Sequence, residues 1–168
     1  RQNRVPTVCN SGYWSPAGSV VCYPCDAGYT CSAGSTSPNT TICPRGAYCP
    51  ANAASPTNCP AGFYGNVTGA SSFAQGCVIC PPSYYCPNSG MTAYSQTCPM
   101  GYYCPAGTSS ATQYPCRAGT YQNLTGQVDI SSCKACPSGI YCAASTGQPT
   151  TLCPAGHVCP TGACLRMY

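Results

Sequence analysis

The sequence predicts a small, disulfide-rich fold: an elongated tandem repeat rod of short β-strands and irregular loops, with almost no helix. Nineteen of the 168 residues are cysteine, above the level of about 8–10% that marks a disulfide scaffold. These cysteines recur in register along the chain, and Leu, Ile and Val are too few to form a continuous apolar core. Crosslinks must therefore supply the stability, each closing a loop worth about 3 kcal/mol in the chain-entropy account.

Three repeats account for nearly the whole chain. Cys22, Cys77 and Cys133 hold the same place in the register, so the step is 55 residues and then 56. Each repeat has six cysteines, and the three sets are Cys9, Cys22, Cys25, Cys31, Cys43 and Cys49; Cys59, Cys77, Cys80, Cys86, Cys98 and Cys104; Cys116, Cys133, Cys136, Cys142, Cys153 and Cys159. We predict cysteine-rich repeats at residues 1–58, 59–115 and 116–163, then a C-terminal end at 164–168 with unpaired Cys164. Units that touch mainly their neighbours should form an elongated rod.

A glycine pattern predicts a reverse turn after many of these cysteines. Eight cysteines have glycine three residues later, namely Gly12, Gly28, Gly46, Gly62, Gly101, Gly119, Gly139 and Gly156. Glycine at the last place of a four-residue stretch is typical of a type I turn. After Cys80 the same place holds Ser83, and after Cys164 it holds Met167. Ten of the 18 prolines directly follow a cysteine, which favours an extended conformation there and predicts strands of two to four residues instead of helices.

Aromatic residues also keep fixed places in the repeats. Trp14, Tyr64 and Tyr121 lie five residues after the first cysteine of each repeat. Four others directly precede a cysteine: Tyr48, Tyr85, Tyr103 and Tyr141. We predict that these rings pack on disulfides in place of an apolar core. A row of sugar-stacking platforms is the alternative.

The charged residues exclude several kinds of partner. Only 5% of residues are charged, against roughly 25% in ordinary soluble domains. The acids are Asp26 and Asp129, and the six bases are scattered: Arg1, Arg4, Arg45, Arg117, Lys134 and Arg166. Nucleic-acid binding needs clustered Lys and Arg, so we predict no nucleic-acid partner. The formal charge of +4 is too diffuse to indicate a membrane surface or an acidic partner.

The cysteine content predicts an oxidising compartment, and hence an extracellular protein, secreted or part of a cell-surface appendage. The sequence starts at Arg1 without an initiator Met or an apolar signal region, as expected of a processed mature chain. No apolar run approaches the roughly 20 residues of a membrane span. We therefore expect no membrane span in this sequence.

Three sequons predict N-linked glycans at Asn39, Asn66 and Asn123, each followed two residues later by threonine. Asn66 and Asn123 each lie seven residues after the first cysteine of their repeat. This shared register favours glycosylation in that loop. Clusters of Ser, Thr and Pro elsewhere are typical of O-glycosylated or flexible loops.

The sequence predicts no metal, cofactor or catalytic site. Three C-x-x-C pairs, Cys22/Cys25, Cys77/Cys80 and Cys133/Cys136, have the spacing of zinc ribbons. Their place inside a longer cysteine register favours disulfides instead, and redox chemistry needs a low-pKa thiolate near a helix start. His157 is the only histidine, and no pattern joins it to a nucleophile and an orienting acid. We therefore expect that the protein is not an enzyme.

Three segments resemble a known module. C-P-A-G-F-Y at residues 59–64, C-P-M-G-Y-Y-C-P at 98–105 and C-P-A-G-H-V-C-P at 153–160 resemble ephrin-receptor-like cysteine-rich repeats and, more distantly, tumour-necrosis-factor-receptor modules. Dense tandem versions rich in Tyr, Gly, Ser and Thr are similar to surface proteins of algae and other protists, including subunits of flagellar hairs, the mastigonemes. The stretch that starts at Cys164 departs from the motif because it lacks the turn glycine.

The resemblance also implies a disulfide pairing that the spacing alone leaves open. The first two cysteines of each repeat would pair, giving Cys9–Cys22, Cys59–Cys77 and Cys116–Cys133. The remaining four would cross-pair, giving Cys25–Cys43, Cys31–Cys49, Cys80–Cys98, Cys86–Cys104, Cys136–Cys153 and Cys142–Cys159.

Two function hypotheses follow. The first is a structural subunit of an extracellular glycosylated filament or surface appendage, self-assembling as a homopolymer through noncovalent contacts between disulfide-stapled rods. The alternative is a ligand-binding ectodomain segment of a receptor-like protein, which should carry a binding insertion or an exposed charged cluster; neither is present. A secreted inhibitor or toxin fits the cysteines but not the three-repeat length.

The odd cysteine bears on how such a polymer could form. A bond through Cys164 joins only two like chains, so continuous polymerisation must rest on noncovalent, nonclosing contacts. The candidates near the two ends are Tyr13, Trp14, Met167 and Tyr168. Burial within their own repeat is the alternative for Tyr13 and Trp14.

Overall fold

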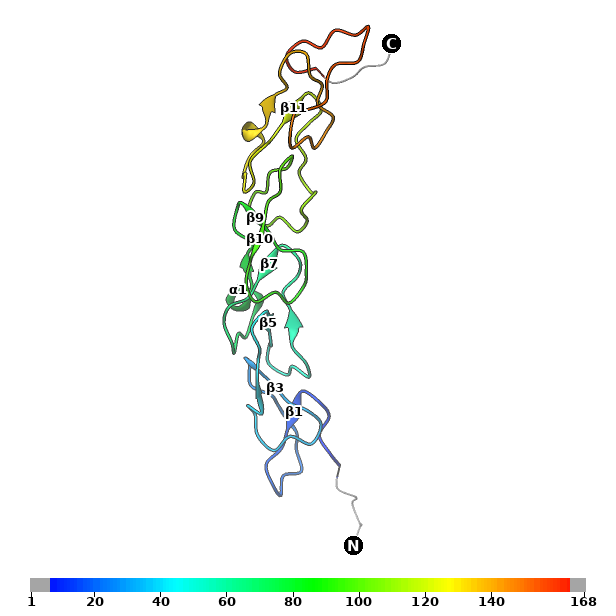
Figure 1. Ribbon diagram of the computed structural model, residues 1–168. Helices are drawn as coiled ribbons and strands as arrows, with labels where there is room; N and C mark the ends of the chain where they lie inside the picture. Colours follow the sequence, from blue (N-terminus) through cyan, green and yellow to red (C-terminus); the bar gives the residue numbers. More distant parts are fainter. Residues whose placement is uncertain (1–6, 164–168) are drawn as a thin grey trace. The chain divides into compact units, whose positions relative to one another are not determined.

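The computed structural model describes residues 7–163, which divide into two compact units. The first holds residues 7–78 together with Ser89–Ala93, and the second holds Ile79–Asn88 and residues 94–163. Each unit consists mostly of loops between very short strands, as the ribbon in Figure 1 shows. The repeat bounds expected from the cysteine register stay a prediction.

Every strand in the described part of the chain has two residues, and the pairs whose register is known are antiparallel. In the first unit the pairs are β1 (Tyr13–Trp14) with β2 (Tyr23–Pro24), β3 (Tyr29–Thr30) with β4 (Thr41–Ile42), and β5 (Ala47–Tyr48) with β6 (Thr57–Asn58). In the strand order β7 (Phe63–Tyr64) is next to β8 (Val78–Ile79). The second unit has β9 (Tyr84–Tyr85) with β10 (Gln96–Thr97), and β11 (Thr120–Tyr121) with β12 (Lys134–Ala135).

Helix is nearly absent from residues 7–163, as predicted. It is limited to α1 (Phe73–Gly76) and the 3₁₀ turn η1 (Ile130–Ser132). Asp129 caps η1, because its Oδ1 accepts a hydrogen bond from the N–H of Ser131 at 2.8 Å. That bond from the Ser131 backbone lowers the pKa of the Asp129 carboxyl below its ordinary value. The prolines after cysteines explain the scarcity of helix.

Nine disulfides join 18 cysteines of the described chain, and the predicted pairing is right for three of them. Cys9–Cys22, Cys59–Cys77 and Cys116–Cys133 form as expected. The cross-pairing implied by the resemblance is wrong. The structure instead has Cys25–Cys31, Cys43–Cys49, Cys80–Cys86, Cys98–Cys104, Cys136–Cys142 and Cys153–Cys159. Cys164 lies outside the described residues.

The turn between the two cysteines is the physical reason for these short disulfides. Each one spans a sequence separation of 6, with Cα atoms 5.8–6.0 Å apart, well within disulfide reach. The chain reverses at the turn residue, glycine or Ser83, so the cysteine six positions later returns beside the first. In three places Ser15, Gly65 or Gln122 stands where that second cysteine would be. There the first cysteine pairs farther along, at separations of 13, 18 and 17.

The turn itself also differs from the predicted type I. The N–H of Phe63 donates to the C=O of Pro60 at 3.2 Å, so Gly62 is the third residue of the turn and not the fourth. Its φ is 85°, the value of the third residue of a type II turn. Glycine adopts this conformation without a Cβ clash, whereas Ser83 holds it with a side chain, at φ 76°.

Cysteine forms most of the core. Of the 18 buried hydrophobic residues in the described chain, 15 are cysteines and the others are Ala47, Ala53 and Ala70. The predicted aromatic residues are half-buried, and some of them contact other rings: Trp14 contacts Tyr23 at 5.7 Å and Tyr103 contacts Tyr114 at 5.5 Å between ring centroids. Their packing on disulfides stays a prediction.

Candidate functional site

The recurring element of this structure is shorter than the predicted repeat. We call it a turn motif, and it runs from a cysteine that opens a turn to the residue before the next such cysteine. The opening cysteines are Cys9, Cys25, Cys43, Cys59, Cys80, Cys98, Cys116, Cys136 and Cys153. Each motif has one disulfide and two residues of positive φ, the turn residue and a second one six or seven positions later. These second residues are Gly18, Gly34, Asn52, Gly69, Gly90, Gly107, Gly126, Ser145 and Gly162.

Backbone hydrogen bonds join consecutive motifs. From the Cys43 motif, the N–H of Gly46 donates to the C=O of Gly65 at 2.9 Å, and the N–H of Cys49 donates to the C=O of Ala70 at 2.9 Å. In return, the N–H of Gly69 donates to the C=O of Cys43 at 2.8 Å. These three bonds satisfy polar groups of a chain that has almost no regular secondary structure.

The same three bonds occur in the second compact unit, between the Cys98 and Cys116 motifs. The N–H of Gly101 donates to the C=O of Gln122 at 2.8 Å, and the N–H of Cys104 donates to the C=O of Gln127 at 2.7 Å. In return, the N–H of Gly126 donates to the C=O of Cys98 at 2.8 Å. In both cases a motif with a short disulfide is followed by one with a long disulfide. The interface between motifs is therefore a fixed pattern that two stretches of different sequence share.

A second contact reaches past the neighbouring motif. A Cβ placed on Gly12 would lie 2.6 Å from the carbonyl oxygen of Asn52, and one on Gly101 would lie 2.2 Å from that of Ser145. These two turn glycines thus let a backbone carbonyl from two motifs further along approach closely, which no side chain would permit. Gly18, Gly139 and Gly156 are different, because a Cβ there would meet nothing within 4 Å.

Buried polar side chains replace the missing cysteine or fill the gaps between turns. Gln122 is 1% exposed; its Nε2 donates to the C=O of Ser132, and its Oε1 accepts from the N–H of Leu124 at 3.0 Å. Thr108 is fully buried and donates to the C=O of Pro105 at 2.6 Å. Sequence reasoning missed both residues, although Gln122 stands six residues after Cys116, where a cysteine is usual.

The two cysteines of each C-x-x-C pair belong to two different disulfides. Cys22 pairs with Cys9 and Cys25 with Cys31, and the other two pairs divide in the same way. The disulfide interpretation of these pairs is confirmed. In the described residues no three His, Cys, Asp or Glu side chains gather as a metal site. His157 is exposed, with its Nδ1 3.2 Å from the C=O of Ala155.

The sequons occupy different surroundings. Asn39 and Asn66 are exposed, whereas Asn123 is half-buried and its Oδ1 is buried without a hydrogen-bond partner. The corresponding loops of Asn66 and Asn123 follow β7 and β11, as the shared register implies. Glycosylation itself stays a prediction.

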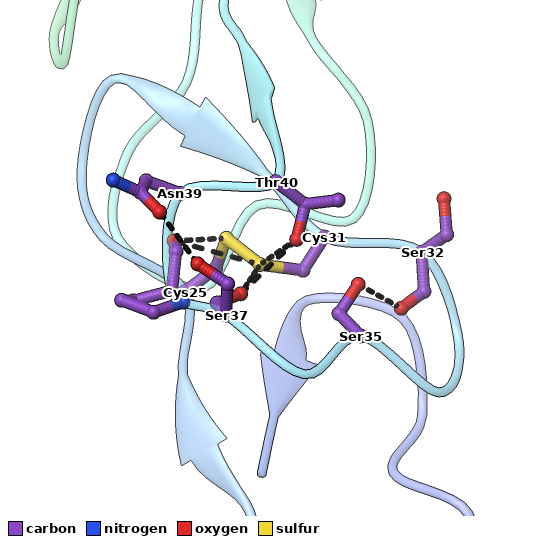
Figure 2. Close-up of a disulfide and its surroundings, with 8 residues drawn as sticks. Cys25, Cys31, Ser32, Ser35, Ser37, Asn39 and Thr40 are labelled. Carbon is purple, nitrogen blue, oxygen red and sulfur yellow. Dashed lines mark hydrogen bonds between the residues drawn. A yellow bond between two sulfur atoms is a disulfide. The ribbon is translucent and has the colours of Figure 1, made fainter. Parts of the chain in front are cut away.

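Figure 2 shows the loop of Asn39 beside the Cys25–Cys31 disulfide. The hydroxyl of Ser37 donates to Asn39 Oδ1 at 2.6 Å, and that of Thr40 donates to the C=O of Ser37 at 3.0 Å. The Asn39 nitrogen points away from the disulfide (Figure 2). This nitrogen, to which an N-glycan would be attached, is thus presented by a loop that its own side chains hold in place.

N-glycosylation should differ among the three sequons. We expect high occupancy at Asn39 and Asn66, because both side chains are exposed, and lower occupancy at Asn123. Enzymatic deglycosylation in ¹⁸O water, followed by peptide mass spectrometry, measures occupancy at each site in native material. Equal occupancy at Asn123 and Asn66 would contradict the role given to burial.

Of the four residues predicted to form end contacts, Tyr13 and Trp14 lie among the described residues. Tyr13 is 36% exposed and its hydroxyl accepts from Asn52 Nδ2 at 3.2 Å, while Trp14 is half-buried against Tyr23. Thus both contact residues of their own compact unit. Met167 and Tyr168 lie outside the described residues. An open hollow lined by Thr7, Val8, Cys9, Asn10, Tyr13 and Cys22 adjoins Tyr13.

Comparisons with known proteins add no family to this geometry. No protein-family model and no curated protein sequence matches the chain. Among the described residues, there is no helix with the length and apolar character needed to cross a bilayer.

Proposed function

We propose that this chain is a structural subunit of an extracellular filament or surface appendage, assembled from copies of itself through noncovalent contacts. The observation that supports this proposal most is the set of backbone hydrogen bonds that joins one turn motif to the next. The interface is made of main-chain groups, so it depends little on the identity of the side chains. A contact of this kind suits repetition.

The disulfides support the same proposal. One bond for each motif holds every turn without a large apolar core, so stability does not require a globular shape. Such a density of disulfides fits an oxidising, extracellular environment. Exposed sequons at Asn39 and Asn66 fit a glycosylated outer surface.

The low charge also favours self-association. Asp26 and Asp129 lie in different compact units and the net charge is +4, so like chains repel one another weakly. An ordinary soluble receptor segment would be expected to present a charged recognition patch. No ion pair or charged cluster in the described residues provides one.

The test is the state of the purified, oxidised and glycosylated chain. We expect its weight-average mass in sedimentation equilibrium to rise continuously with concentration, and negative-stain electron microscopy to show fibres. Glycosylated, oxidised chain that stays monomeric at high concentration would refute the filament role and favour a ligand-binding ectodomain.

A further inference from the structure

The described chain has unpaired backbone groups in its last turn motif. In the Cys153 motif, the N–H of Gly156, the N–H of Cys159 and the C=O of Cys153 have no hydrogen-bond partner among residues 7–163. The equivalent groups of the Cys43 motif, in Gly46, Cys49 and Cys43, are all bonded to the motif that follows. The last described motif therefore has the full set of groups for one more interface.

The first turn motif has the complementary set. The C=O of Ser15, the C=O of Ser19 and the N–H of Gly18 have no hydrogen-bond partner among the described residues. Ser15 holds the place of Gly65 in its motif, while Gly18 and Ser19 hold the places of Gly69 and Ala70. Two acceptors and one donor at this end thus match two donors and one acceptor at the other.

The disulfide order agrees with this match. In both compact units a motif with a short disulfide precedes one with a long disulfide, as at Cys43–Cys49 before Cys59–Cys77. The last described motif has the short Cys153–Cys159 disulfide, and the first has the long Cys9–Cys22 disulfide. A first motif placed after a last motif repeats a step that the chain already makes twice.

Exposed apolar side chains provide independent support. Val20, Val158 and Leu152 are the most exposed large apolar residues of the described chain, at 96%, 92% and 75%. Val158 stands directly before the second cysteine of its motif, as Tyr48 does, and Tyr48 packs on Phe73 at 6.0 Å between ring centroids. Val20 lies in the loop of the Cys9 motif that corresponds to that of Phe73.

Leu152 has a similar counterpart. It directly precedes Cys153, as Ile42 precedes Cys43. A Cβ on Gly69 would contact the Ile42 side chain at 3.5 Å, and Ile42 is 51% exposed. The greater exposure of Leu152 is what the loss of one such neighbour would produce.

We propose that the Cys153 motif of one copy binds the Cys9 motif of a second copy, head to tail. Gly156 and Cys159 donate their N–H groups to the carbonyls of Ser15 and Ser19 of the second copy, whose Gly18 N–H donates to the C=O of Cys153. This inference rests on the proposed filament function and gives that function a defined contact. Because the two surfaces are different, the contact is heterologous, and it generates an open filament when the rotation between copies does not close a ring.

The position of Gly139 provides a steric test. In the proposed junction, the carbonyl of the second copy's Gly18 lies over Gly139 as that of Asn52 lies over Gly12, where a Cβ would be 2.6 Å from the oxygen. Within one chain a Cβ on Gly139 meets nothing within 4 Å. Gly139→Asn should therefore fold, since asparagine tolerates positive φ, yet block the junction.

Gly126→Asn is the matched control. Gly126 has φ 70° against 78° for Gly139, and a Cβ there makes only ordinary contacts, 3.6 Å from Thr97 and 3.8 Å from Ser83. We expect Gly139→Asn to raise the concentration of half-assembly at least about tenfold, equivalent to about 1.4 kcal/mol, and Gly126→Asn to change it less than about twofold. Sedimentation velocity measures both, in a Cys164→Ser background that removes the thiol.

A mixing experiment tests the direction of the contact. Gly139→Asn blocks one end and Val20→Asp, at a side chain 96% exposed in the single chain, blocks the other. Alone, each variant should stay monomeric at a concentration at which the parent chain assembles. Mixed, they should form a one-to-one dimer that grows no further, because each retains the end that the other lacks.

The outcomes separate this junction from the proposed function. Parent chain that remains monomeric would overturn both. If parent chain and Gly139→Asn form fibres at the same concentration, the filament function stands and the head-to-tail junction is wrong. Folded blocked variants that fail to pair when mixed would also overturn the junction, even if each alone is monomeric.

Discussion

Gly46→Ala should destabilise the protein by roughly 2–5 kcal/mol. The Cβ would lie 2.3 Å from the carbonyl oxygen of Gly90 and 2.8 Å from its carbon, both backbone atoms that a rotamer change cannot move. Overpacking of this kind adds about 1–3 kcal/mol or more to the cost of about 1–2 kcal/mol for a side chain at positive φ. Thermal or urea unfolding of oxidised chain measures the loss.

Gly156→Ala is the matched control for this variant. Its φ is 81° and that of Gly46 is 80°, but a Cβ on Gly156 meets nothing within 4 Å. Only the conformational cost of about 1–2 kcal/mol should remain, when measured at a concentration at which the chain is monomeric. Equal losses at the two positions would show that backbone conformation, and not the close carbonyl, makes glycine necessary.

The sequence was sufficient for the fold class because cysteine, proline and glycine constrain the chain locally. Prolines after cysteines predicted the absence of helix, and turn glycines predicted reversals at disulfides. These features depend on residues close in sequence, and local stereochemistry decides them. The three long disulfides were also correct, but the family resemblance implied them and the spacing did not.

The short disulfides were missed because the family resemblance implies partners that are farther apart than a constant spacing in the sequence indicates. A cysteine lies six residues after Cys25, Cys43, Cys80, Cys98, Cys136 and Cys153 alike, whereas the implied partners were 17 or 18 residues away. A type II turn within six residues closes such a loop at little cost in chain entropy. The residue types alone do not show that the glycine is the third residue of its turn and not the fourth; its positive φ does.

The contacts between motifs could not be predicted from the sequence, because they are made by backbone groups. Nothing in the residue types of Gly46 and Gly65, or of Gly101 and Gln122, marks them as partners. The buried Gln122 shows the same limit: its role depends on the empty place of a cysteine and on the carbonyl of Ser132. Tertiary placement, rather than composition, decides such pairs.

Loss of an interior disulfide should be costlier than loss of a terminal one of equal loop length. Cys98–Cys104 and Cys153–Cys159 both have a sequence separation of 6, so the chain-entropy term, about 2 kcal/mol, is the same. Cys98 and Cys104 are 0% and 1% exposed, whereas Cys153 is half-buried and Cys159 is 8% exposed. The interior pair therefore also loses packing when both cysteines are replaced by alanine.

We expect about 4 kcal/mol of lost stability for Cys98→Ala with Cys104→Ala, and about 2 kcal/mol for Cys153→Ala with Cys159→Ala. Urea unfolding of the two double variants and of the parent chain gives the comparison. The single variant Cys98→Ser checks the pairing itself, because it should release one thiol, at Cys104. Alkylation under denaturing but non-reducing conditions, followed by peptide mapping, identifies that thiol. A label at Cys80 would restore the cross-pairing and remove the structural basis for the turn motif.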